Sequence, residues 1–261
     1  MADSWTLTCR LLERTLRSIA QQRSQEFEII VVGNERPRIA FDHAKIHYLT
    51  VDLPLPGTGH KNKDLDRVKK VLTGFYHAKR FDPDYVMPMD ADDLVHRDLS
   101  TYIASRQESN GWYVNSGYVY EEDRRFIYWR RSGFQRWCGS SHIFNYHRHP
   151  MPLAPNDYRE SLIQYYKNHR DILTTTQREG RNLDPLPFSA ITYTVGNGEN
   201  IYQKSFAMVH HANRRNWLFK LKDLRNYRWL RRSHRDTYGL INLEELHIRL
   251  EDKAKQRQLS A

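Results

Sequence analysis

The sequence contains little cysteine and no long apolar run. Only two cysteines, Cys9 and Cys138, occur among its 261 residues, and they do not form a CxxC pair. This spacing argues against a disulfide scaffold or a cysteine zinc site, and it fits a reducing cytosol. No apolar stretch is long enough to span a bilayer, and the first residues lack the apolar region of a signal peptide. We therefore expect a cytoplasmic protein that contacts membranes at most peripherally.

Internal repeats and low-complexity linkers are also absent, which favours a single domain. With 39% hydrophobic and 28% charged residues, the chain is expected to be globular with a sizeable core. Its 41 Lys and Arg exceed its 31 Asp and Glu, so the net charge is +10. An anionic partner is therefore expected, and nucleic acid, an anionic membrane surface and phosphorylated small molecules all fit.

Helical and strand-like patterns alternate in the first hundred residues. Residues 11–22 predict a helix with an apolar stripe, and we expect Arg14 and Arg17 to face away from it. Two strands and another helix follow, over residues 28–32, 46–53 and 64–79. This order predicts an α/β fold with a mostly parallel sheet flanked by helices. Such a sheet usually begins with a strand, so we expect the fold either to start at the helix or to lack its first strand.

The second half predicts mixed structure. Its pattern indicates a hairpin around Glu121–Asp123, several short strands and two short helices. The strands are expected over residues 112–120, 126–129, 137–144 and 187–195, and the helices over residues 157–169 and 171–180.

Three carboxylates crowd one short turn after the apolar run at residues 85–89. Asp90, Asp92 and Asp93 offer oxygen ligands of the kind that Mg²⁺ or Mn²⁺ prefers. In open α/β sheets, ligands bind at the carboxyl ends of the strands, where this turn is expected. The alternative is a helix cap, with Asp93 or Asp98 at the positive end of the next helix.

Three ordered stretches resemble a known family. The stretches LLERTLRSIAQQ, FEIIVVGNE and GFYHAKRFDPDYVMPMDADD are similar to the nucleotide-binding half of GT-A glycosyltransferases of the inverting family-2 type. The resemblance covers roughly residues 11–99, with a looser one to about residue 195 and a weaker similarity to rhamnosyltransferases. It implies a nucleotide-sugar-binding half at 1–99, an acceptor-side half at 100–212 and a basic helical extension at 213–261.

The resemblance also implies an activity. This activity is the metal-dependent transfer of a hexose from a nucleotide-diphosphate sugar to a hydroxyl acceptor, in polysaccharide or glycolipid assembly. Asp90 is then expected to contact ribose or metal, Asp92 to bind the cation and Asp93 to support the site. His211 is a candidate for a further metal ligand. A cation at this place stabilises the charge that grows on the leaving diphosphate.

One departure from the family concerns the nucleotide pocket. Family members usually carry an Asp after the second strand, whereas this chain has Asn34 and Glu35, which we keep as nucleotide-binding candidates. This loop and the missing first strand support a second hypothesis, a non-catalytic glycosyltransferase-like binding protein. Arg67 and Lys70 are candidate phosphate contacts, although lysines and arginines on a helix commonly only face solvent.

The catalytic base is expected in the second half. The order of elements favours Asp171, then Asp157, while His169 is a candidate base or orienting residue. Either aspartate alone also fits a helix N-cap. His142 is expected to be a polar residue with satisfied hydrogen bonds on an acceptor-side strand.

The segment from residue 213 is basic and aromatic. Such a composition suits an anionic membrane surface, which would fit a lipid-linked acceptor, or single-stranded nucleic acid. Nucleic acid ranks last, because the chain has no recognisable nucleic-acid module. We favour an amphipathic helix that packs Trp217, Leu218, Leu221 and Leu224 onto the core.

Overall fold

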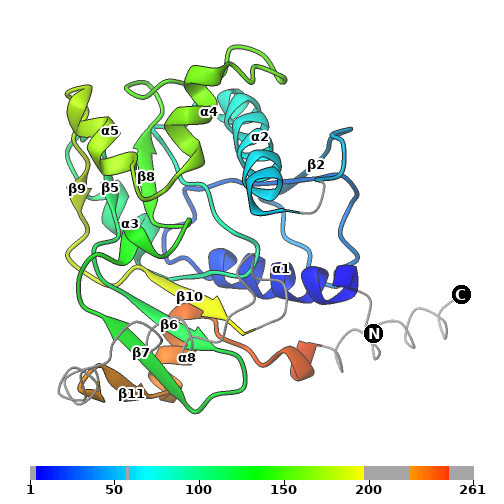
Figure 1. The fold of residues 1–261 in the computed structure, drawn as a ribbon. Coiled ribbons are helices and arrows are strands. Elements are labelled where there is room, and N and C mark those ends of the chain that lie inside the picture. The colour runs from blue at the N-terminus through cyan, green and yellow to red at the C-terminus, as the bar shows by residue number, and fades with distance from the viewer. Residues whose placement is uncertain (1–3, 57–58, 197–223, 247–261) are drawn as a thin grey trace, which may run out of the picture.

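The computed structural model describes residues 4–56, 59–196 and 224–246. In these residues the fold is mixed α/β, with helices packed around sheets that contain both parallel and antiparallel strands (Figure 1). Three of the strand pairings are parallel and five are antiparallel. The α/β class is thus confirmed, but the expectation of a mostly parallel sheet is wrong for the described residues.

The first helix, α1 (Ser4–Ala20), is buried around most of its circumference. It packs against β4 (Leu94–Val95), and Figure 1 shows it in blue across the middle of the molecule. Leu11 and Leu16 are buried as an apolar stripe requires. Arg14, expected to face solvent, is fully buried instead, because its guanidinium pairs with Glu122 from the distant hairpin at 2.9 Å.

A two-stranded parallel sheet follows α1. Strands β1 (Ile29–Gly33) and β2 (Ile46–Thr50) pair in register, so both carboxyl ends lie at one edge. Helix α2 (His60–Ala78) packs on β1, and its Gly74 lies against Val32. The predicted strands and the parallel pairing are confirmed for this layer.

The acidic turn belongs to a different part of the architecture. Strand β3 (Tyr85–Val86), shorter than predicted, pairs with β8 and not with β1 or β2. It joins a four-stranded sheet of order β3-β8-β5-β9, in which the partners are β8 (His142–Asn145), β5 (Gly111–Tyr113) and β9 (Asp184–Pro185). Because β3 leads directly into the turn, this sheet positions it.

A five-stranded sheet forms the third layer. Its order is β11-β7-β6-β10-β4, with β6 (Gly117–Glu121), β7 (Phe126–Arg130), β10 (Ile191–Val195) and β11 (Tyr227–Trp229). Strands β6 and β7 form the predicted hairpin, while β6 and β10 run parallel. The mixed character expected of the second half is confirmed here.

The remaining helices are short. They are α3 (Leu99–Ala104), α4 (Glu160–Lys167), α5 (Ile172–Arg178) and α8 (Arg232–Tyr238), with single 3₁₀ turns at Lys79–Phe81 and Phe134–Arg136. Helices α2 and α4 pack side by side (Figure 1). In the described residues, no helix is long and apolar enough to cross a membrane.

Strand β8 separates two hydrophobic clusters. Ile143 belongs to the cluster between the sheets, whereas Phe144 packs with Val68, Leu72 and Phe75 of α2. Side chains of a strand alternate between its faces, so His142 lies on the same face as Phe144, toward α2. Their rings stack 6.2 Å apart.

The basic C-terminal segment is described only in part. Residues 224–246 include a strand, β11, that joins the sheet, so the expectation of a purely helical extension is wrong there. Leu224 and Trp229 are 61% and 62% exposed, which contradicts the packing expected for Leu224. Trp217, Leu218 and Leu221 lie outside the described residues.

Candidate functional site at the acidic turn

The three carboxylates lie on a turn between β3 and β4. The turn is closed by the Asp93 N–H, which donates to the Asp90 carbonyl at 3.3 Å. The helix-cap alternative is wrong for Asp93, because this residue precedes β4 and not a helix. Asp98 does occupy the N-cap position of α3, but its side chain makes no capping hydrogen bond. The predicted turn after a strand is therefore confirmed.

Asp93 faces the interior. It is fully buried, its Oδ2 accepts a hydrogen bond from the Cys138 thiol at 3.2 Å, and its Oδ1 accepts one from the Thr194 N–H at 3.3 Å. Burial, together with the charges of Asp92 and Asp90, raises the pKa of Asp93 well above its ordinary value. Asp93 thus joins the turn to β10, and because both of its oxygens accept hydrogen bonds inside the protein, it is poorly placed to bind a cation.

Asp90 is partly exposed and pairs with Arg67. The Nε atom of Arg67, on α2, lies 2.6 Å from Asp90 Oδ1, and the two side chains are 24% and 30% exposed. Burial lowers the pKa of Arg67, but the charge of Asp90 more than offsets this, and the pKa is raised. The site therefore holds a fixed, partly exposed cation beside the carboxylates.

A loop of small residues closes the site from the other side. The Asp90 N–H donates to Ser140 Oγ at 2.8 Å. A Cβ atom at Gly139 would lie 2.6 Å from both Arg67 Nη2 and Asp90 Oδ2. Glycine lets the loop approach this closely without displacing the ends of the two side chains, so Gly139 and Ser140 are site residues that sequence reasoning missed. The run Gly-Ser-Ser was the available signal.

Two histidines lie close to this pair. Burial lowers the pKa of His169, the Arg67 charge lowers it further and the Asp90 charge raises it. Its Nε2 lies 3.3 Å from the Arg136 carbonyl. Burial, together with the charges of His169 and Arg67, lowers the pKa of His142 to about 3. The predicted candidate His169 is thus brought to the turn, together with His142.

The other predicted residues have different surroundings. The Asp157 carboxylate accepts the Leu153 N–H at 2.9 Å and the Arg159 guanidinium at 2.8 Å, and these hydrogen bonds hold its own loop and lower its pKa. Asp171 is exposed at the N-cap position of α5 and accepts from the Asn168 amide at 2.5 Å. Both carboxylates therefore hold local structure. The N-cap alternative is right for the position of Asp171, whereas the N-cap residue of α4 is Arg159 and not Asp157.

The remaining candidates are also accounted for. Lys70 pairs with Asp66 one helical turn away at 2.7 Å. The Asn34 amide donates to the Leu53 carbonyl at 2.6 Å and so joins the loops after β1 and β2, while Glu35 is exposed. His211 lies outside the described residues.

The turn offers few side-chain ligands for a metal ion. Within residues 4–56, 59–196 and 224–246, no three His, Cys, Asp or Glu side chains form a group that could hold a metal ion. Mg²⁺, however, usually takes only one or two protein carboxylates and completes its shell with water and substrate phosphates. Asp90 and Asp92 are the two partly exposed carboxylates of the turn to which this smaller requirement applies, whereas Asp93 is buried.

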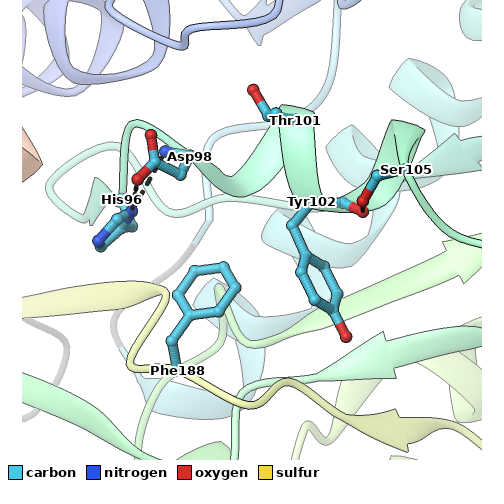
Figure 2. Close-up of a pocket in the computed structure, with 6 residues that line it drawn as sticks. All are labelled: His96, Asp98, Thr101, Tyr102, Ser105 and Phe188. Carbon is cyan, nitrogen blue, oxygen red and sulfur yellow. Dashed lines mark hydrogen bonds and ion pairs between the residues drawn. The ribbon is translucent and has the colours of Figure 1, made fainter.

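A shallow pocket lies apart from the acidic turn. Its volume is about 380 Å³, and it is lined by His96, Asp98, Thr101, Tyr102, Ser105 and Phe188 (Figure 2). The ring centroids of Tyr102 and Phe188 are 5.4 Å apart, and His96 Nδ1 lies 3.8 Å from Asp98 Oδ2. This lining holds one carboxylate and no Lys or Arg, so the chemistry of the acidic turn is not repeated there.

No family model, curated protein or solved structure matches this chain. The function therefore has to be inferred from the chemistry of the site.

Proposed function

We propose that this protein is a metal-dependent glycosyltransferase that moves a hexose from a nucleotide-diphosphate sugar to a hydroxyl acceptor. The observation that carries the proposal is the Arg67–Asp90 pair at 2.6 Å beside Asp92, at the mouth of a turn that follows a strand. The acceptor class, a growing glycan or a lipid-linked sugar, follows from the resemblance to GT-A enzymes.

The diphosphate of the donor fits this mouth electrostatically. The guanidinium of Arg67 presents several N–H donors, which suit phosphate oxygens. Asp90 and Asp92 would hold Mg²⁺ or Mn²⁺ together with those oxygens. When bound, the cation supplies electrostatic stabilisation of the leaving diphosphate. At Gly139 no side chain crowds the Arg67 guanidinium, since a Cβ atom there would lie 2.6 Å from Arg67 Nη2.

His169 is the best-placed group to accept the proton of the acceptor hydroxyl. Its lowered pKa keeps the imidazole neutral at pH 7, as a base requires. The Arg136 carbonyl can only accept, so Nε2 carries the proton of that hydrogen bond and Nδ1 has the lone pair. Asp171 and Asp157 rank behind His169, because each carboxylate already accepts local hydrogen bonds.

A thermal-shift panel tests this proposal. UDP-glucose, GDP-mannose and dTDP-rhamnose are each added with and without Mn²⁺ to the wild type, to Asp92→Asn and to the control Asp236→Asn. A ligand that binds the native state raises the unfolding midpoint by mass action. We expect a Mn²⁺-dependent shift with one nucleotide sugar, lost in Asp92→Asn and retained in Asp236→Asn, where a 60% exposed side chain is changed.

Two results would contradict it. A shift that does not depend on Mn²⁺, or one retained by Asp92→Asn, argues against a cation at the turn. The absence of a shift with every donor argues against donor binding itself.

A second candidate function is a non-catalytic glycosyltransferase-like binding protein. The specific observation in its favour is that Arg67 already neutralises Asp90 at 2.6 Å, so the turn can hold an anion without a metal. Asp92→Asn separates the two functions, because it should abolish sugar transfer in the first case and leave ligand binding intact in the second. Transfer of a radiolabelled hexose to a lipid or glycan extract is the readout.

A further inference from the structure

A buried histidine beside the acidic turn lacks a hydrogen-bond partner on one nitrogen. His142 is 0% exposed, and within the described residues its Nε2 has no partner. His149 lies four residues after the end of β8, and its side chain is 5% exposed, so it is a suitable comparison. Both of its nitrogens are satisfied, by the Tyr165 hydroxyl at 2.8 Å and the Asn110 carbonyl at 2.7 Å. Buried polar atoms normally have partners, so the exception at His142 requires an explanation.

The hydrogen bonds around His142 fix which nitrogen is protonated. The Ser141 hydroxyl has one proton, which it donates to the Cys138 carbonyl at 2.6 Å. Its oxygen can therefore only accept from His142 Nδ1, which lies 3.2 Å away. Nδ1 consequently carries the ring proton, and Nε2 presents a bare lone pair. Only a hydrogen-bond donor can satisfy it.

Several observations place this ring at the base of the candidate site. Its side chain lies on the α2 face of β8, beside Phe144. The preceding residues of the same loop, Gly139 and Ser140, contact the Arg67–Asp90 pair directly. Arg67 and Asp90 are partly exposed whereas His142 is buried, and the Arg67 charge helps to lower the pKa of His142.

We infer that His142 Nε2 accepts a hydrogen bond from a hydroxyl group of the donor sugar. Phosphate oxygens are acceptors and cannot satisfy the lone pair, so the diphosphate is excluded. The base and ribose are expected on the β1 side, near Asn34. Among the groups of the nucleotide sugar, the sugar hydroxyls are the hydrogen-bond donors that remain. This inference rests on the proposed function and makes His142 a determinant of specificity for the sugar.

The first test examines the free protein by ¹⁵N NMR of its histidine rings. In the wild type without ligand, the His142 Nε2 resonance should have the chemical shift of an unprotonated nitrogen from pH 8 to pH 5. A protonated Nε2 would overturn the inference whatever the protein binds. A change of this resonance to the chemical shift of a metal-bound nitrogen on addition of Mg²⁺ alone would also overturn it, whereas a small shift from a cation at Asp90 and Asp92 would not.

The second test separates the sugar from the nucleotide. Calorimetric titration with Mn²⁺ present compares UDP-glucose, GDP-mannose and dTDP-rhamnose with their free nucleoside diphosphates, for wild type, His142→Phe and His149→Phe. For the donor that binds, His142→Phe should weaken the sugar nucleotide about threefold to tenfold and leave the free diphosphate unchanged. His149→Phe should change neither affinity.

The outcomes distinguish this inference from the proposed function. Equal affinity of wild type and His142→Phe for the sugar nucleotide overturns the role of His142 and leaves the proposed function standing. Equal weakening of the sugar nucleotide and its free diphosphate also overturns it, because the loss would not belong to the sugar. If no donor binds the wild type, both fail. Should His142→Phe not fold, the NMR experiment on the wild type still decides, since added sugar nucleotide must shift Nε2 and the free diphosphate must not.

Discussion

Two arginine–carboxylate pairs connect helices to distant turns in this protein, and they differ in burial. Arg14 of α1 pairs with Glu122 beyond β6, with side chains 0% and 9% exposed. Arg67 of α2 pairs with Asp90, with side chains 24% and 30% exposed. Both distances are below 3 Å. The pairs have the same chemistry but lie in different dielectric surroundings.

This difference indicates different roles. The buried pair can be reached by no ligand, and removing one partner leaves a charge without compensation in the core. The partly exposed pair contributes less to stability but can exchange its partner for a phosphate or a cation. We therefore assign Arg14–Glu122 to the fold and Arg67–Asp90 to the site.

The largest expected effect comes from breaking the buried pair. Glu122→Gln leaves Arg14 buried without its counter-charge, which should lower the free energy of unfolding by about 3–5 kcal/mol. Urea denaturation measures this free energy of unfolding. The matched control is Glu121→Gln, where the neighbouring carboxylate faces an arginine that is 67% exposed at 3.8 Å, and a change below about 1 kcal/mol is expected. Similar losses in the two variants would contradict the assignment.

Acidification should destabilise the fold through its buried histidines. Burial lowers the pKa of His142 to about 3 and those of His149 and His234 to about 4. The unfolded chain takes up protons near the ordinary value of 6.5 while the folded chain does not, so this stability is complete above pH 6.5 and is lost as the pH falls toward 4. Each histidine should lower the free energy of unfolding by about 2 kcal/mol between pH 7 and pH 5.

Urea denaturation at pH 7 and pH 5 checks this dependence. In His149→Phe, the difference in the free energy of unfolding between pH 7 and pH 5 should be smaller by the contribution of one histidine, about 2 kcal/mol. An unchanged difference would show that His149 titrates normally in the folded protein.

A smaller effect is expected where the loop approaches the exposed pair. Gly139→Ala places a Cβ atom against Arg67 and Asp90, whose flexible ends must move apart. Affinity for the donor should fall about tenfold, or about 1.4 kcal/mol, with little loss of stability. Gly74→Ala is the control, because its Cβ would meet Val32 at an ordinary 3.4 Å. Equal donor affinity in Gly139→Ala and wild type would remove Gly139 from the site.

The smallest effect on stability is expected from the exposed pair itself. Arg67→Ala should change the free energy of unfolding by about 0–1 kcal/mol, since Asp90 keeps access to water. The same urea measurement applies. A loss as large as that of Glu122→Gln would mean that the two pairs do not differ in role.

Local pattern accounts for much of the fold. The helix predicted over residues 64–79 is present as α2, and its Leu65, Val68, Leu72 and Phe75 pack into one cluster. The hairpin around residues 121–123 and the parallel pairing of β1 with β2 also follow from periodicity and turn residues. Such elements are predictable because each depends on residues close together in the chain.

The environment of the individual side chains could not be predicted. Arg14 lies on the face that periodicity assigns to solvent, but Glu122, 108 residues away, receives it in the core. His142 was expected to be satisfied, and its Nε2 is not. Asp171 and Asp157 fitted the family order, yet each carboxylate holds local structure.

The sequence by itself determined where the carboxylates lie along the chain, because an apolar run followed by Asp90, Asp92 and Asp93 can only form a strand end and a polar turn. Only the tertiary structure decided what each carboxylate faces. Asp93 turned inward to Cys138 and Thr194, and Asp90 met Arg67 from 23 residues before it and Ser140 from 50 residues after it. The physical reason is that hydrophobic periodicity fixes local elements, while charge and hydrogen-bond partners are set by how distant elements pack.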